Sequence, residues 1–139
     1  DVIIVQWDTL TDPTRTFDRI HSKNIKVGLG LGTEDEVEDS SRFFRDVDLI
    51  LLLGVYPGFG GQPMQPGMLE RIAVVRCLTD QLDHRINIAV DGGVKPENIS
   101  NLVQAGADIL IMGTALFQSS DMAQTIKLIR ESTAAPLRR

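Results

Sequence analysis

The sequence is short of cysteine, of basic residues and of long apolar runs, and each shortage excludes a class of protein. Cys77 is the single cysteine among 139 residues, so the chain forms no internal disulfide and fits a reducing compartment. The 14 basic residues against 19 acidic ones give a formal net charge of -5. This balance argues against a general nucleic-acid surface or a surface for anionic membranes, yet it allows a local anion site.

No apolar run approaches the length of a membrane span, and no signal peptide is recognisable. With 42% hydrophobic and 24% charged residues, the composition is typical of a soluble globular protein, which we expect in the cytoplasm. Residues 1–139 suit a single domain. The chain starts at Asp1 and enters an apolar run at Val2, so we interpret it as a fragment of a longer protein.

Five apolar segments are typical of β-strands, namely residues 2–5, 25–31, 48–53, 86–90 and 108–112. Each is followed by a signal for a helix start, at Thr11-Asp12-Pro13, at a capping box of Thr33 with Glu36, at Pro66, at Pro96 and at Ser119-Ser120-Asp121. Residues 134–139 are expected to form a frayed tail. The alternation predicts an α/β fold with a parallel sheet and right-handed crossovers.

Two architectures satisfy this pattern. One is a five-stranded doubly wound sheet, and the other is the C-terminal five βα units of a (β/α)8 barrel, whose full length is about 250 residues. Both bind ligands at the carboxyl ends of their strands. Residues that carry chemistry are therefore expected at those ends.

The third strand leads into a glycine-rich loop at residues 55–62, with Gly58, Gly60 and Gly61 within four positions. Bare backbone of this kind turns sharply and can point N–H groups at an anion. The loop is neither a Walker motif nor a dinucleotide fingerprint, because the glycine spacing is wrong for both. A phosphate loop, a mobile lid and an ordinary turn all remain open at this point.

Asp91 is the strongest single candidate for chemistry, because it ends the fourth strand and precedes Gly92 and Gly93. Its carboxylate suits a general acid or base, a metal ligand, or both. The structural alternative is a helix cap or a loop brace. After the fifth strand, Gly113 and Thr114 offer N–H groups and one hydroxyl to an anion, or form an ordinary turn.

The remaining polar candidates are weaker. We expect His21 and His84 to be surface residues, and Cys77 to be a small packed residue rather than a nucleophile. Gln6 and Asp8 follow the first strand and are candidates to face the same site.

Four strings of residues, in this order and spacing, resemble the ribulose-phosphate 3-epimerase family. They are Val55-x-Pro57-Gly58-Phe59-Gly60-Gly61-Gln62, then Val90-Asp91-Gly92-Gly93-Val94 followed by Asn98-Ile99, then Ala105-Gly106-Ala107-Asp108, and finally Gly113-Thr114-Ala115-Leu116-Phe117. The resemblance runs along nearly the whole chain. The string from Pro57 to Gln62 is far more specific than any lone glycine pattern.

The resemblance implies a metal-dependent isomerase on a phosphate-binding (β/α)8 barrel, truncated here to about the last five units. Enzymes of this family interconvert D-ribulose 5-phosphate and D-xylulose 5-phosphate through an enediolate, using two aspartates on opposite faces of C3 and a divalent cation (Zn, Fe, Mn or Co). By position, Asp91 is implied to be one acid/base and a metal ligand. The loop of Gly58, Phe59, Gly60 and Gly61 is implied to cover the substrate, and Gly92, Gly93, Gly113 and Thr114 to bind its phosphate.

The family's first three βα units carry the second aspartate, two histidine metal ligands and a substrate-binding serine, and no segment here matches them. We therefore predict that this chain alone is inactive. Several positions also depart from the family pattern, namely Gln6, Gly32, Thr33, Leu53 and Tyr56.

Other functions stay open beside this one. They are a related sugar-phosphate epimerase, such as one acting on a ketohexose 6-phosphate, and a noncatalytic phosphate-binding domain. A truncated barrel has open strand edges at residues 2–5 and 109–112, so we expect a homo-oligomer.

Overall fold

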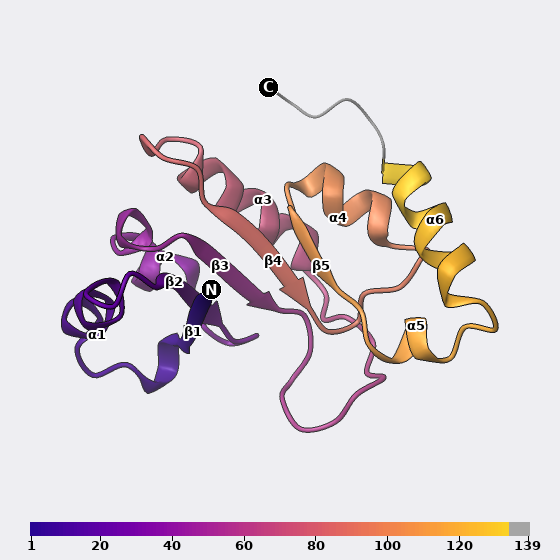
Figure 1. The fold of residues 1–139 in the computed structure, drawn as a ribbon, viewed down its shortest axis with the longest axis horizontal. Coiled ribbons are helices and arrows are strands. Elements are labelled where there is room, and N and C mark those ends of the chain that lie inside the picture. The colour runs from indigo at the N-terminus through magenta and orange to yellow at the C-terminus, as the bar shows by residue number, and fades with distance from the viewer. Residues whose placement is uncertain (134–139) are drawn as a thin grey trace.

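The computed structural model describes residues 1–133, and its centre is one parallel sheet in the order β1-β2-β3-β4-β5 (Figure 1). The strands are β1 (Val2–Gln6), β2 (Lys26–Leu31), β3 (Leu49–Leu53), β4 (Asn87–Asp91) and β5 (Ile109–Ile111). A doubly wound sheet reverses its strand order at a switch point, and this sheet has no reversal. The fold is therefore five consecutive βα units of a (β/α) barrel, and the doubly wound alternative is wrong.

Within residues 1–133, six α-helices and two 3-10 turns connect or follow the strands. They are η1 (Trp7–Thr9), α1 (Pro13–His21), α2 (Val37–Ser41), η2 (Phe44–Asp46), α3 (Met68–Thr79), α4 (Ile99–Ala105), α5 (Thr114–Phe117) and α6 (Met122–Thr133). Figure 1 shows α3 running behind β4, with α4 and α6 beyond it. None of the helices in residues 1–133 has the length and apolar character needed to cross a membrane.

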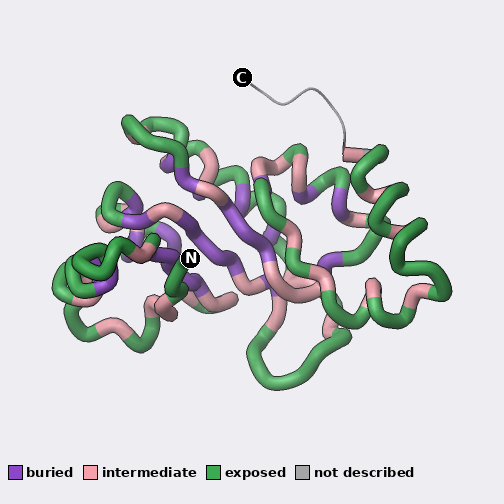
Figure 2. The backbone as a smooth tube through the Cα atoms, in the orientation of Figure 1, coloured by how far each residue is buried: buried purple, intermediate pink, exposed green. Residues whose placement is uncertain are grey.

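The sheet has two unlike faces, because side chains alternate along each strand. Ile50, Leu52 and Val90 are fully buried in the main core, which they share with the helices. Leu49, Leu51 and Ala89 form a separate small cluster on the opposite face. This second face corresponds to the interior of a barrel. In Figure 2, burial is greatest in the central strands of the sheet.

The helix starts in the structure can be compared with the capping signals predicted from the sequence. Asp12 caps α1 as predicted, since its carboxylate accepts a hydrogen bond from the backbone N–H of Arg15 at 3.1 Å. The capping box of Thr33 with Glu36 is wrong, because α2 begins at Val37 and Glu36 makes no side-chain cap. The carboxylate of Asp35 instead accepts a hydrogen bond from the N–H of Gly32 at 2.7 Å, which closes a turn before the helix.

Two further expectations need adjustment. α4 begins at Ile99 rather than at Pro96, and the short helix α5 was not expected from the sequence. The predicted tail at residues 134–139 lies outside the described residues.

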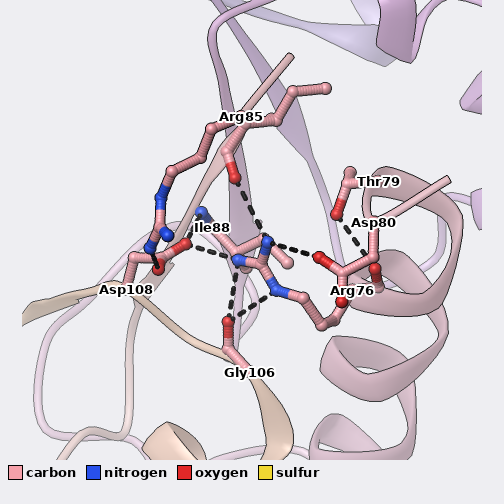
Figure 3. A network of polar contacts seen from close by, with 8 residues as sticks. Arg76, Thr79, Asp80, Arg85, Ile88, Gly106 and Asp108 are labelled. Carbon is pink, nitrogen blue, oxygen red and sulfur yellow. Dashed lines mark hydrogen bonds and ion pairs between the residues drawn. The ribbon is translucent and has the colours of Figure 1, made fainter. Parts of the chain in front are cut away.

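At the amino ends of β4 and β5, a polar network ties the sheet to α3 (Figure 3). The guanidinium of Arg76 donates to the carbonyl of Gly106 at 3.0 and 3.2 Å and pairs with Asp108. Asp108 also accepts from Arg85 at 2.6 Å and from the N–H of Ile88 at 2.9 Å. This network holds the end of the sheet that lies opposite the glycine-rich junctions.

Candidate functional site

The carboxyl ends of β3, β4 and β5 meet in one cleft of about 570 Å³. Because the three strands are parallel neighbours, the segments that follow them converge at the same edge of the sheet. Three segments far apart in the sequence line the cleft, at residues 55–62, 91–95 and 113–115, together with Leu53, Ile111 and Gln118. Asp91 and all the residues that the family resemblance implies for substrate and phosphate binding therefore lie around a single cavity.

Asp91 is the last residue of β4 and is partly buried. Its backbone carbonyl accepts a hydrogen bond from the N–H of Gly54 at 2.7 Å, while its carboxylate has no hydrogen bond or ion pair within residues 1–133. The turn before α4 is held by Asn98, whose side-chain oxygen accepts from the N–H of Lys95 at 2.9 Å. Asp91 thus acts neither as a helix cap nor as a loop brace, and its carboxylate is available to the cleft.

Gly92 and Gly93 both adopt positive φ angles, 99° and 70°. A Cβ atom on Gly93 would lie 2.5 Å from the backbone nitrogen of Met64, and one on Gly92 would lie 2.5 Å from a methyl group of Val55. Only glycine combines this backbone conformation with so close an approach. The two glycines therefore bring the chain after β4 against the base of the glycine-rich loop.

Gly113 differs from these two, because its φ of −102° is open to any residue and no atom lies within 4 Å of its Cβ position. Gly113 itself lines the cleft. A side chain at this position would therefore fill the cavity without disturbing the packing around it.

The loop at residues 55–62 reaches across the cleft to the segment after β5. A Cβ atom on Gly60 would lie 3.2 Å from the hydroxyl oxygen of Thr114, so the bare loop tip rests beside that side chain. Phe59 at the tip is 74% exposed and Tyr56 is 46% exposed. Residues 55–62 form one wall of the cleft.

The structure places some residues differently from what the sequence led us to expect. Gln6 packs over Gly30 of the neighbouring strand, and neither it nor Asp8 lines the cleft. Lys95 and Gln118 do line it and were not singled out. For Lys95 a signal was present, since it is a cation four residues after Asp91 in a segment that follows a strand end.

His21 and His84 are exposed, as expected, yet both line a second cavity of about 350 Å³ beside α1. Nε2 of His21 lies 3.6 Å from the carboxylate of Asp48. Cys77 is exposed rather than packed, so that expectation is wrong.

The divalent metal that the resemblance implies needs several donors close together. Among the last residues of the five strands, Asp91 is the only carboxylate, the others being Gln6, Leu31, Leu53 and Ile111. Within residues 1–133, no three His, Cys, Asp or Glu side chains are grouped so that they can hold a metal ion. The residues present do not form a metal site by themselves, and we derive no step of a reaction through one.

Comparison with known proteins agrees with this geometry. The model of the ribulose-phosphate 3 epimerase family matches residues 1–117. Ribulose-phosphate 3-epimerase of Bacillus subtilis (strain 168) is 34% identical over 133 residues, which cover 95% of this chain and 61% of that protein. The protein of the same name from Escherichia coli (strain K12) is 35% identical over 120 residues, or 86% of this chain and 53% of the relative.

Among solved structures, a 3-hexulose-6-phosphate synthase superposes with a TM-score of 0.67 over 96% of this chain and 62% of its own. At 22% identity it supports the barrel fold alone. The chain spans less than two thirds of each of these proteins. With the matching family model, the identity to both relatives and the convergence of its motifs on one cleft, the chain belongs to the ribulose-phosphate 3-epimerase family.

Proposed function

We propose that this chain contributes the phosphate-binding part and one acid/base carboxylate of an epimerase that interconverts D-ribulose 5-phosphate and D-xylulose 5-phosphate. The observation that carries the proposal is the unpaired carboxylate of Asp91 in the same cleft as the bare backbone at Gly92, Gly93 and Gly113. Such an arrangement suits a ligand with an anionic end and an acidic C–H bond.

The chemistry follows from the position of the reacting carbon. The proton on C3 of the ketose lies next to the C2 carbonyl, so its removal gives an enediolate, and its return to the opposite face inverts C3. Asp91 would take or return the proton on one face. The N–H groups of Gly92, Gly93, Gly113 and Thr114 would hold the phosphate, and the loop of Gly58, Phe59, Gly60 and Gly61 would exclude water.

One carboxylate can serve only one face of C3, so inversion by two carboxylates needs a second one, and Asp91 is the only carboxylate among the described residues that line the cleft. Purified chain is therefore expected to convert ribulose 5-phosphate no faster than buffer does. Turnover well above that background, removed by Asp91→Asn, would contradict this.

Phosphate binding tests the site without requiring activity. We expect inorganic phosphate and ribulose 5-phosphate to shift the amide NMR signals of residues 92, 93, 113 and 114. Gly113→Val fills the open side of the cleft, so phosphate affinity should fall by about tenfold or more. Asp91→Asn removes a negative charge and should leave phosphate affinity no weaker than before. Unchanged affinity in Gly113→Val would show that this segment does not bind the phosphate.

A related phosphosugar is the second candidate, because two of the positions that depart from the family pattern, Leu53 and Tyr56, line the cleft. Gln6, Gly32 and Thr33 do not line it, so they bear less directly on substrate choice. Titration with ribulose 5-phosphate, a ketohexose 6-phosphate and inorganic phosphate separates the possibilities. Equal affinity for all three would favour a noncatalytic phosphate-binding domain.

A further inference from the structure

The glycine-rich loop is tied together by one of its own side chains. Nε2 of Gln62 donates a hydrogen bond to the carbonyl oxygen of Tyr56 at 2.7 Å and another to the carbonyl oxygen of Phe59 at 2.8 Å. The acceptors lie six and three residues before the donor. A single amide nitrogen therefore connects the start, the tip and the end of the loop.

No other hydrogen bond holds the loop between these points. Within residues 1–133, the bonds from Gln62 are the only ones that residues 55–61 form. Three of these seven residues are glycines, and Gly58 and Gly61 have φ angles of 140° and 80°. A glycine-rich segment without such a tie samples many conformations, because glycine has the largest backbone freedom.

The two ends of the loop are anchored separately. The N–H of Gly54 donates to the carbonyl of Asp91 at 2.7 Å, and the N–H of Gln65 donates to the carbonyl of Gly54 at 2.8 Å. A Cβ atom on Gly54 would lie 2.4 Å from the carbonyl oxygen of Gly92, so this anchor is tightly packed. Any movement of the loop is therefore confined to the residues between Gly54 and Gln65.

We propose that Gln62 is a positioning residue, whose amide N–H groups give the loop one shape and hold its Gly60–Gly61 tip beside Thr114 before a ligand arrives. The ligand then does not have to order the seven residues of the loop. The part of this inference that concerns a sugar phosphate rests on the proposed function. The shape of the loop does not depend on it.

The first test removes the donor while keeping the size of the side chain. The side chain of Gln62→Met has no N–H group. Gln104→Met is the matched control on α4, because within residues 1–133 the side chain of Gln104 donates only to Ser100, at 3.3 Å. We expect the amide order parameters of residues 58–61 to fall from about 0.8 to below about 0.6 in Gln62→Met, and to stay unchanged in Gln104→Met. Unchanged values in Gln62→Met would overturn the proposal.

Proteolysis gives an independent measure, because Phe59 and Phe117 are exposed to a similar degree, 74% and 76%. Limited digestion with chymotrypsin should cut after Phe59 about tenfold faster in Gln62→Met, since a protease needs an adaptable segment. Cleavage after Phe117 serves as the internal reference and should keep its rate. Equal acceleration at both sites would mean general destabilisation and would count against a local brace.

Gln62→Glu separates a hydrogen-bond donor from a side chain that only fills space. The ionised carboxylate cannot donate to two carbonyl oxygens, but the protonated acid carries one O–H donor. We expect the loop order parameters of this variant to be low at pH 7 and to recover partly near pH 4, around the ordinary carboxyl pKa of about 4.3. A loop as ordered as wild type at pH 7 would argue against the donor role.

Titration with inorganic phosphate then distinguishes this inference from the proposed function. We expect a loss of affinity of about threefold to tenfold in Gln62→Met and none in Gln104→Met. A wild-type chain that binds no phosphate, with a loop that still loosens in Gln62→Met, would contradict the proposed function and leave the brace standing. A loosened loop with unchanged phosphate affinity would overturn the part of the inference that links loop shape to the ligand.

Discussion

At the scale of single residues, glycine serves two different purposes around the cleft. Gly93 is required by the fold, because its φ is 70° and its Cβ position overlaps the backbone of Met64. Gly113 has an ordinary φ and free space beside it. The same residue type is thus structural at one strand end and open to a ligand at the next.

This difference predicts unequal effects on stability. Gly93→Ala should lower the free energy of unfolding by about 2–4 kcal/mol, since a left-handed backbone and a steric overlap add together. Gly113→Ala should change it by no more than about 0.5 kcal/mol. Urea unfolding followed by circular dichroism measures both. A Gly93→Ala protein as stable as wild type would show that the chain after β4 relaxes away from Met64.

His84 offers a second test at this scale, through its pKa. Nδ1 lies 3.2 Å from the carboxylate of Asp83 and Nε2 lies 3.3 Å from the carbonyl of Val47. A neutral imidazole has one N–H group and cannot donate to both acceptors, whereas the protonated ring can. The hydrogen bond with Asp83 is the larger cause and that with Val47 the next, and together they raise the pKa of His84 above 6.5.

The sign of the pH dependence follows from this direction. A pKa that is higher in the folded chain contributes stability that is fully present below about pH 6.5 and is lost as the pH rises through the folded pKa. NMR titration of the imidazole should give a midpoint above 6.5, and Asp83→Asn should lower it. The same midpoint in both proteins would mean that the Asp83 contact is not formed in solution.

At the scale of elements, the two ends of the sheet have separate tasks. The carboxyl ends of β3, β4 and β5 form the cleft, while the amino ends of β4 and β5 are tied to α3 through Arg76 and Asp108. The side chain of Asp108 is 19% exposed and accepts from two guanidinium groups and a backbone N–H. Its loss would leave the N–H of the fully buried Ile88 without this acceptor and the partly buried Arg76 without its carboxylate.

Asp108→Asn should therefore lower the free energy of unfolding by about 2–3 kcal/mol. Asp80→Asn is the matched control, because Asp80 contacts the same Arg76 at 3.3 Å but is 65% exposed. We expect its effect to stay below about 1 kcal/mol. Both variants should bind phosphate as wild type does, since the network lies at the far end of the strands. Equal losses in the two variants would show that Asp108 is no more than a surface ion pair.

At the scale of the whole molecule, apolar side chains are exposed where an eight-stranded barrel would cover them. β1 exposes Val2, Ile3 and Ile4, and β5 exposes Ile109 and Ile111, each by 39–43%. β1 and β5 are also the two edges of the sheet. Open edges and an apolar face promote association with another chain.

We therefore expect the purified chain to self-associate, with a mass above that of a monomer in light scattering at micromolar concentration. The double variant Ile4→Lys with Ile111→Lys should shift the chain toward a monomer, because it places charge on both edges. Val74→Lys on α3 is the control, as Val74 has a similar exposure of 42%. A monodisperse wild-type monomer would contradict the prediction.

Much of this molecule follows from its sequence alone. Apolar runs of strand length and the alternation with helices gave the five strands, and the motif strings gave the family, because these signals are local in the chain. The pattern also placed Asp91, Gly92, Gly93, Gly113 and Thr114 at strand ends, where parallel strands converge. Hydrophobic periodicity left the choice between two architectures open, because it carries no strand order, and the motif strings then favoured the truncated barrel, which the structure confirms.

The tertiary structure decided what depends on contacts between distant residues. The strand order excludes the doubly wound sheet, and within residues 1–133 the carboxylate of Asp91 makes no hydrogen bond, while Asn98 holds the following turn. Asp35 replaces the expected capping box because its carboxylate reaches Gly32. The two hydrogen bonds of Gln62 have no sequence signature. Such contacts are decided by how the folded backbone turns, and sequence spacing alone does not contain that information.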